Sequence, residues 1–359
     1  MLKILIVATK DDPHLLAVSW GLRKLGHEPT IWYGSNFPKQ DAGFLRLNQE
    51  KLSFGLHIDG VLHTEPFDVI WVRRMGNPAP PDGSHPDDVF AIRQESKSFV
   101  ANLLPHLGHA GTRWVNHPDG DHRCRNKIDQ LLAARAVGFR VPDTLMGNDI
   151  GAVRRFFDQQ HNIVHKAFNF LQWQNEDGSQ TAGRTSPVDA SHLAQDFAVR
   201  ACPGIYQKNI GKSHELRVTV IGETVIAARI DSQHDGQTTD WRYDGGRGTT
   251  NLSAVDLDPA LAERCRAFCR SMGVVVGCID LIVQPDGEVI FLEINSMGQF
   301  LFNEIADPRL PMLDTFCRYL VHGDARQDGD GLPALRFADF RAEEEAGPGG
   351  GAWLKRALF

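Results

Sequence analysis

Two carboxylates and an amide lie at positions where a β-hairpin would bring them onto one face. Asp280 belongs to an apolar segment that reads as a strand, and Glu293 and Asn295 belong to the next apolar segment. The Asp286-Gly287 pair between the segments is typical of a two-residue hairpin turn. With this pair as the loop, Asp280 falls directly opposite Glu293, and Asn295 shares their face two residues further along.

Opposed carboxylates repel each other, so we expect a cation between them. Oxygen ligands of this kind favour Mg²⁺, with Mn²⁺ as the other candidate, and the metal is usually shared with nucleotide phosphates. A hairpin with a polar outer face is the alternative, because the apolar residues of the other face fit both interpretations: Ile279, Leu281 and Val283. The convergence of three oxygen ligands favours the metal site, and two ions are expected.

Two lysines in separate elements are candidate phosphate ligands. Lys127 opens a predicted helix, and Lys166 lies inside the apolar segment 163–168, which reads as a strand. A charged lysine in a strand is costly to bury without a partner, and a polyphosphate would supply one. A solvated surface charge is the alternative interpretation for each lysine taken alone.

A third pattern is typical of an adenosine site. The backbone groups of one predicted strand and of the residues after it can meet an adenine edge; they belong to Gln207, Lys208, Asn209 and Ile210. In the following strand, alternation places Glu215 and Arg217 on one face. Glu215 could accept hydrogen bonds from ribose hydroxyls and Arg217 could bind phosphate, while a salt bridge between strands is the alternative.

The elements that must position these residues follow an α/β order. Residues 2–9, 30–33 and 67–72 read as strands, and residues 13–25 read as the helix after the first of them. This rhythm predicts an N-terminal domain with a parallel sheet. Because the first strand leads into residues 8–12 without a GxGxxG loop, a dinucleotide-binding domain is excluded.

Three further segments are irregular in sequence. Residues 169–187 suggest a polar hairpin with a mobile tip. Residues 231–251 are rich in Gly and Asp, and a loop of this length is usually functional or mobile. From about residue 325 the low complexity of the sequence predicts a flexible tail.

Composition excludes several classes of protein. The length of 359 residues predicts two or three modules, and 42% hydrophobic residues are ordinary for a globular protein. A net charge of -7 argues against general nucleic-acid binding. No apolar run approaches the roughly 20 residues that span a bilayer. The six cysteines form no CxxC pair and no zinc-ligand spacing, so we expect reduced thiols in a cytoplasmic protein.

In their order and residue types, these motifs resemble the ATP-grasp superfamily over about residues 110–320. Closer matches resemble the graspetide synthetases, the microviridin-type peptide maturases. They lie in residues 71–74, 114–118, 126–131, 141–145, 231–233, 240–242 and 293–300. Ser296 departs from the proline that many members of that family place there.

The resemblance implies an α/β (α+β) ATP-grasp fold that begins with a Rossmann-like pre-ATP-grasp domain at residues 1–118. A central domain, 119–203, would carry the Lys166 strand and a leader-binding hairpin around residues 170–186. The C-terminal ATP-grasp domain, 204–324, would carry the metal site, and 325–359 would be the flexible tail.

The family activates Asp or Glu side chains of a ribosomal precursor peptide as acyl phosphates, using ATP and Mg²⁺. Ser, Thr or Lys side chains then close ω-ester or ω-amide macrocycles, and Arg217 and Arg242 would steady the transferring group. The implied partners are the leader and core of the peptide, with no nucleic acid or membrane, and a homodimer is left open. The alternatives are a ligase that joins an amino acid to a small molecule or peptide terminus, and a nucleotide-bound module that binds peptides without catalysis.

Overall fold

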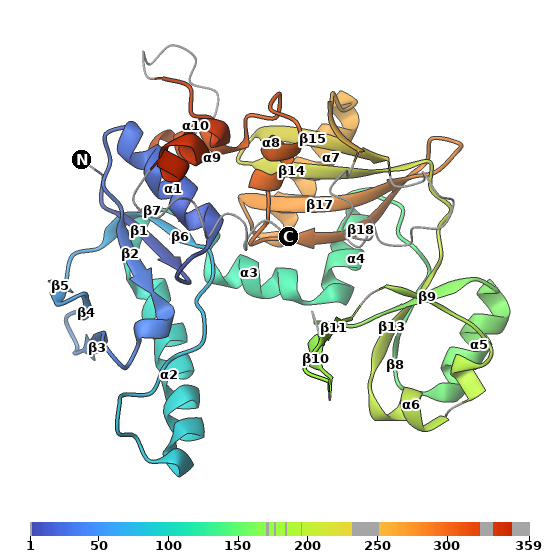
Figure 1. The fold of residues 1–359 in the computed structure, drawn as a ribbon, viewed down its shortest axis with the longest axis horizontal. Helices are drawn as coiled ribbons and strands as arrows, with labels where there is room; N and C mark the ends of the chain where they lie inside the picture. The colour runs from blue at the N-terminus through green and yellow to red at the C-terminus, as the bar shows by residue number, and fades with distance from the viewer. Residues whose placement is uncertain are drawn as a thin grey trace.

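A computed structural model gives the architecture of the chain (Figure 1). It describes residues 2–169, 172–175, 177–183, 185–194, 196–231, 251–323 and 333–346. The expected catalytic residue Arg242 and most of the expected loop 231–251 lie outside these ranges. Helices and strands are mixed along the chain in several sheets, so the expected α/β (α+β) class is confirmed.

The N-terminal part is a parallel sheet with the strand order β2-β1-β6-β7. Its strands are β1 (Ile4–Ala8), β2 (Thr30–Tyr33), β6 (Phe67–Val72) and β7 (Gly108–Val115). Alternate residues of β1 enter two different cores, one beneath helix α1 (Pro13–Lys24) and the other beneath helix α2 (Val89–Leu103). The sheet is therefore covered on both faces, which explains why β1 reads as a continuous apolar run.

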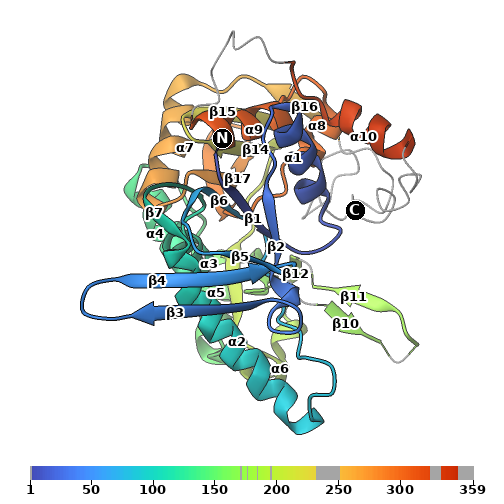
Figure 2. The ribbon, with the colours of Figure 1, turned by 90° about the vertical axis from the view of Figure 1, so that its left-hand side faces the viewer.

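The sequence analysis missed an antiparallel three-stranded sheet beside this domain (Figure 2). It consists of β3 (Ala42–Leu47), β4 (Leu52–Ile58) and β5 (Val61–His63). Apolar residues of this sheet are unusually exposed: Leu47 is 77% exposed and Val61 is 59% exposed. In β4, however, alternation is regular: Phe54, Leu56 and Ile58 are 7%, 0% and 4% exposed in one core, so this strand could have been predicted.

A second module, the lysine sheet, has the strand order β12-β9-β13-β8. Its strands are β8 (Thr144–Gly147), β9 (Ile163–Lys166), β12 (Ser186–Val188) and β13 (Gly204–Lys208). Helices α5 (Ile150–Gln160) and α6 (Asp196–Ala201) lie beside this sheet, and Val153 of α5 packs into its small core (Figure 1). Strands β10 (Gln172–Gln174) and β11 (Gln180–Ala182) form the expected hairpin, which projects from the molecule in Figure 2.

The C-terminal module, the metal-strand sheet, has the order β16-β15-β14-β17-β18 and is antiparallel. Its strands are β14 (His214–Ile221), β15 (Thr224–Asp231), β16 (Asn251–Val255), β17 (Val276–Val283) and β18 (Val289–Asn295). Helices α3 (Pro118–Arg125) and α4 (Lys127–Ala136) lead to it, and α7 (Pro259–Met272), α8 (Leu301–Ala306) and α9 (Met312–His322) complete it. Helices α4 and α7 pack against one core of this sheet, while α9 packs against the core shared with α1.

The expectation of a flexible tail is wrong for residues 333–346. Helix α10 (Phe337–Ala346) packs against α1 and α8, and Phe337 and Phe340 are 2% and 1% exposed. The Trp20 indole of α1 also donates a hydrogen bond to Glu343 at 2.7 Å. Low overall complexity concealed a pair of phenylalanines at helical spacing, which is enough to anchor a short helix to an existing core. Among the described helices, none is both long and apolar enough to cross a membrane.

Candidate active site

Strands β17 and β18 carry the three predicted metal ligands, but the turn between them differs from the prediction. Gln284 N donates to Glu288 O at 2.9 Å, so the loop has three residues, 285–287, and the expected two-residue loop is wrong. Gly287 has a φ of 87°, the left-handed conformation that closes three-residue hairpin loops. Near the turn the pairing is therefore shifted by one residue, with Val283 opposite Val289.

A β-bulge restores the predicted pairing at the ligands. Leu281 pairs with Phe291, whereas Asp280 pairs with Glu293, so Leu292 is an extra residue on β18. Phe291 is 0% exposed in the core, while Leu292 and Glu293 both line a pocket. The longer loop and the bulge offset each other, and Asp280 lies opposite Glu293 as the sequence predicted.

Arg217 of β14 holds the first of these carboxylates. It lies opposite Asp280 in the sheet, and its Nη1 is 2.6 Å from Asp280 Oδ1. The two side chains are only 5% and 11% exposed, so solvent screens this ion pair little. Arg217 Nη2 also donates to Gln299 O at 3.3 Å, in the loop that follows β18. A predicted catalytic arginine thus contacts a predicted metal ligand directly.

Lys127 of α4 holds the second carboxylate. Asn126 caps this helix, since its side-chain oxygen accepts from the backbone N–H of Ile128 at 3.1 Å. At the first helical position, Lys127 Nζ reaches Glu293 Oε2 at 2.7 Å. Each of the two opposed carboxylates therefore contacts a basic side chain, and this positive charge offsets their mutual repulsion. Asn295 lies opposite Cys278, on the face that Glu293 shares.

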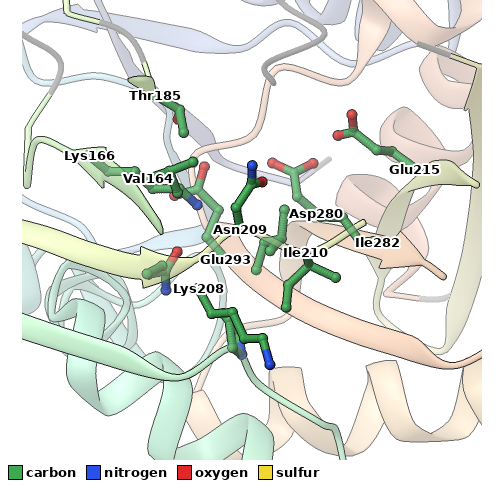
Figure 3. A pocket seen from close by; sticks show the side chains of 13 residues that line it. Val164, Lys166, Thr185, Lys208, Asn209, Ile210, Glu215, Asp280, Ile282 and Glu293 are labelled. Carbon is green, nitrogen blue, oxygen red and sulfur yellow. The ribbon is translucent and has the colours of Figure 1, made fainter. Parts of the chain in front are cut away.

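One pocket brings most of the predicted binding residues together (Figure 3). Predicted residues in its wall are Lys166, Gln207, Lys208, Asn209, Ile210, Glu215, Asp280 and Glu293. The wall also contains Pro142, Val164, Thr185, Ile282 and Leu292, which the sequence analysis had not singled out. The pocket lies between the lysine sheet and the metal-strand sheet, and its mixture of apolar side chains, lysines and carboxylates suits a nucleotide. Lys127, Arg217 and Asn295 are not in the wall.

The strand edge predicted to meet adenine is partly used within the protein. Lys208 N donates to Asp143 O, and Asn209 N donates to Asn162 O, both at 2.9 Å. Gln207 is 4% exposed, and its amide donates to Thr144 Oγ1 at 3.0 Å. Across the described residues, no acceptor is found for the N–H of Ile210. The backbone donor best placed for an adenine edge is therefore Ile210.

Glu215, the predicted ribose ligand, contacts a lysine that the sequence analysis missed. Lys212 Nζ lies 2.5 Å from Glu215 Oε1, and the two side chains are 9% and 8% exposed. Lys212 lies in a short loop without periodicity, where a buried lysine cannot be distinguished by sequence from a solvated one. Only its spacing of three residues from Glu215 could have signalled the pair.

The cysteines offer no nucleophile near this pocket. All six are free thiols, and Cys278 of β17 is fully buried. Burial raises the pKa of the Cys278 thiol, and it raises the pKa of Cys265 to about 12. The neutral thiol is a poor nucleophile, and no cysteine is among the residues of the pocket wall.

Solved structures with this fold are numerous, whereas no family model and no curated protein matches the chain. A RiPP-associated ATP-grasp ligase from Chryseobacterium gregarium, in complex with ADP and a leader and core peptide, is 25% identical with a TM-score of 0.81. The match covers 92% of this chain and 100% of that chain. The macrocyclase MdnC of Microcystis aeruginosa MRC, bound with precursor peptide MdnA, is 26% identical with a TM-score of 0.78. That match covers 89% of this chain and 100% of MdnC.

The fold and the pocket define this chain as an ATP-grasp protein. Macrocyclase MdnB of the same organism, at 22% identity and a TM-score of 0.73, has the same fold over 90% of this chain. At 25% and 26% identity, the chain is similar to a RiPP-associated ATP-grasp ligase and to a macrocyclase. The resemblance to graspetide synthetases that the sequence motifs indicated is confirmed.

Proposed function

We propose that this protein is an ATP-dependent carboxylate ligase that closes macrocycles in a ribosomal precursor peptide. The observation that carries the proposal is the opposed pair Asp280 and Glu293, which faces a pocket also lined by Lys166 and by residues of β13. The C. gregarium ligase with ADP, leader and core peptide, and MdnC with its precursor peptide, support it through the shared fold at 25% and 26% identity.

The reaction proceeds in two steps. A side-chain carboxylate of the peptide attacks the γ-phosphorus of ATP, and the bond from this phosphorus to the β-phosphate oxygen breaks. ADP departs, and the peptide carries an acyl phosphate. A Ser or Thr hydroxyl or a Lys amine of the same peptide then attacks the acyl carbon. Phosphate leaves, the nucleophile loses its proton, and an ω-ester or ω-amide remains. Each ring therefore removes the elements of one water from the peptide and converts one ATP to ADP and phosphate.

The carboxylates fit a divalent cation. Asp280, Glu293 and Asn295 present hard oxygen donors on one face, the set that Mg²⁺ prefers and that Mn²⁺ also accepts. Across the described residues, no group of three or more His, Cys, Asp or Glu could hold a metal alone, which is consistent with ions that share phosphate ligands. When bound, two such ions would neutralise charge on the β- and γ-phosphates.

The residues of the chain itself bind and orient the substrates. Lys166 would contact phosphate oxygens, and the N–H of Ile210 would donate to the adenine ring. Lys127 can exchange its contact with Glu293 for one with phosphate once a cation takes its place. Arg217, fixed by Asp280, would supply positive charge where oxyanions develop, and Arg242, outside the described residues, is proposed for the same task.

The proposed domains assign these tasks to separate parts of the chain. Residues 119–203 would supply Lys166 and a leader-binding surface at the β10–β11 hairpin, and residues 204–324 would supply the metal site.

Incubation of the protein with ATP, Mg²⁺ and the precursor peptide encoded beside its gene tests the proposal. Mass spectrometry should show peptide products lighter by whole waters, with one ADP released per ring. A product heavier by a second substrate would indicate an amino-acid ligase instead. Unchanged peptide with no ADP release would indicate a binding module and would overturn the proposal.

A further inference from the structure

Strand β18, which carries Glu293 and Asn295, is at the edge of its five-stranded sheet. Its partner strand is β17, and on its outer side Ile290 forms an isolated parallel bridge with Arg140. The outward N–H and C=O groups of an edge strand have no ladder partner, so they must be satisfied by other groups where they are buried. At Phe291 the outward N–H donates to the backbone carbonyl of Arg140 at 2.9 Å. Closer to the metal ligands, the partner is a side chain.

Gln130 of α4 contacts both backbone groups of Ile294. Ile294 N donates to Gln130 Oε1 at 3.0 Å, and Gln130 Nε2 donates to Ile294 O at 3.2 Å. The same Nε2 donates to Cys124 O at 2.5 Å, so the amide makes three hydrogen bonds. Gln130 is 1% exposed, and these bonds are shielded from water. The amide therefore takes the place that one residue of a neighbouring strand takes in a β-ladder.

Ile294 lies directly between the two ligands Glu293 and Asn295. Its own side chain is 2% exposed and belongs to the core that α4 and α7 cover. With its side chain and both backbone groups fixed, β18 cannot rotate about its axis at this residue. Because neighbouring residues of a strand point to the opposite face, Glu293 and Asn295 are directed away from the core and toward the other side of the sheet.

A second buried amide fixes the chain just beyond the ligands. Asn116 is 5% exposed, and its Nδ2 donates to Ser296 O at 2.9 Å and to Val276 O at 2.7 Å. Its Oδ1 accepts from Val276 N at 2.9 Å. Asn116 ties β18 to β17 within the sheet, whereas Gln130 ties β18 to a helix. Of these two amides, Gln130 is the one that couples the backbone of the ligand strand to α4, the helix whose Lys127 also contacts the Glu293 side chain.

We infer that Gln130 is a positioning residue for the metal site, because its amide fixes the strand that presents Glu293 and Asn295. The inference rests on the proposed ATP-dependent function, since it gives Gln130 a role in binding the metal–nucleotide complex. An amide is required: a carboxylate at position 130 accepts from Ile294 N but cannot donate to Ile294 O, and an alkyl side chain does neither.

Binding measurements on Gln130→Leu and Gln130→Glu test this inference. Calorimetry should show that both variants bind Mg·ADP about tenfold more weakly than the wild type, a typical cost of losing a group that orients metal ligands. Affinity for ADP without Mg²⁺ should stay within about twofold, because Gln130 is not among the residues of the pocket wall. In the protein without nucleotide or metal, hydrogen exchange at the Ile294 amide should be faster in both variants.

Leu131→Ala is the matched control, because Leu131 follows Gln130 on α4 and is 6% exposed in the same core. It should lower the melting temperature while leaving Mg·ADP affinity unchanged. The inference would be overturned if the Gln130 variants bound Mg·ADP as tightly as the wild type, or if Leu131→Ala weakened Mg·ADP binding as much as they do. The proposed function would stand in either case. If the wild type itself binds no Mg·ADP, the proposed function fails and the inference fails with it. Should Gln130→Leu not fold, the nearly isosteric Gln130→Glu decides the question.

Discussion

At the scale of single residues, two ion pairs hold the proposed metal ligands Asp280 and Glu293. Arg217 contacts Asp280 at 2.6 Å and Lys127 contacts Glu293 at 2.7 Å. The first pair is buried, whereas Glu293 and Lys127 are 26% and 23% exposed at the side chain. A buried pair is costly to break by removing one partner, and a partly exposed pair is not. The two carboxylates should therefore respond differently to mutation.

Glu293→Gln and Asp280→Asn should both abolish ring formation, because each removes one proposed metal ligand. Glu293→Gln should leave the free energy of unfolding within about 1 kcal/mol of the wild type. Asp280→Asn should lower it by about 3 kcal/mol, since Arg217 keeps a buried charge without its carboxylate. Urea titration followed by fluorescence, together with ADP release, measures both effects. Near-normal turnover of either variant in Mg²⁺ would disprove the ligand assignment.

His14 predicts how stability depends on pH. Its Nε2 accepts from Phe300 N at 3.1 Å, next to the loop after β18, so the ring must be neutral there. Burial and the charge of Arg73 lower the pKa of His14 from 6.5 to about 4, against the opposing influence of Asp12. The unfolded chain therefore binds the extra proton first, and stability is lost as pH falls from 6.5 toward 4.

The expected loss reaches about 1.4 kcal/mol per pH unit inside that window. Urea unfolding of the wild type at pH 7 and pH 5 measures it. His14→Gln keeps an acceptor for Phe300 N but does not titrate, so its stability should change less between the two pH values. Equal slopes for wild type and variant would show that His14 does not control this window. Asp12 and Arg74 are the other charged groups near the ring.

At the scale of elements, the helix predicted at residues 13–25 and the strands predicted at 2–9, 30–33 and 67–72 agree with α1, β1, β2 and β6. In the structure Asp12, Asn126 and Asp258 cap α1, α4 and α7, as side chains of these types commonly do. The hairpin was harder, because a three-residue loop and a bulge cannot be read from the Asp-Gly pair alone. Gln130 was missed for a related reason, since its partner Ile294 is far away in the sequence and is brought to it by packing.

The hairpin turn allows a prediction at this scale. Gly287 has a φ of 87°, and a Cβ there would meet nothing within 4 Å. Gly287→Ala should therefore cost only the backbone strain, about 1 kcal/mol in unfolding free energy, with turnover unchanged. Gly222, with a φ of 57° in the turn after β14, is the contrasting case, because a Cβ would lie 2.5 Å from Tyr319. Gly222→Ala should cost more, and equal costs in thermal unfolding would contradict this account.

At the scale of the whole molecule, the residues of the candidate site and those that hold them come from separate parts of the fold. The predicted ligands lie on the metal-strand sheet, and Lys166 lies on the lysine sheet. Helix α1 of the N-terminal part holds Phe300, after β18, through His14. The class of fold was predictable from the order of motifs. The docking of α10 was not, because it depends on contacts between segments far apart in the chain. The β3–β5 sheet joins neighbouring strands, with the Asp59-Gly60 turn between β4 and β5, so its signal is local and was overlooked.

The tail helix gives a prediction of global stability. Phe340 is 1% exposed and its ring lies 5.9 Å from that of Trp20. Phe340→Ala should lower the free energy of unfolding by about 3 kcal/mol, a typical cost for a buried phenylalanine. Phe197→Ala is the matched control, since Phe197 is 84% exposed and its loss should stay within about 0.5 kcal/mol. Similar melting temperatures for the two variants would mean that α10 does not contribute to the core.

The most direct test of the central claim follows oxygen from the peptide to phosphate. A precursor peptide whose Asp and Glu side chains carry ¹⁸O is incubated with the protein, ATP and Mg²⁺. If a carboxylate attacks the γ-phosphorus and phosphate later leaves the acyl carbon, each ring transfers one ¹⁸O atom to inorganic phosphate. Unlabelled phosphate alongside closed rings, or release of AMP in place of ADP, would contradict the acyl-phosphate mechanism that we assign to this site.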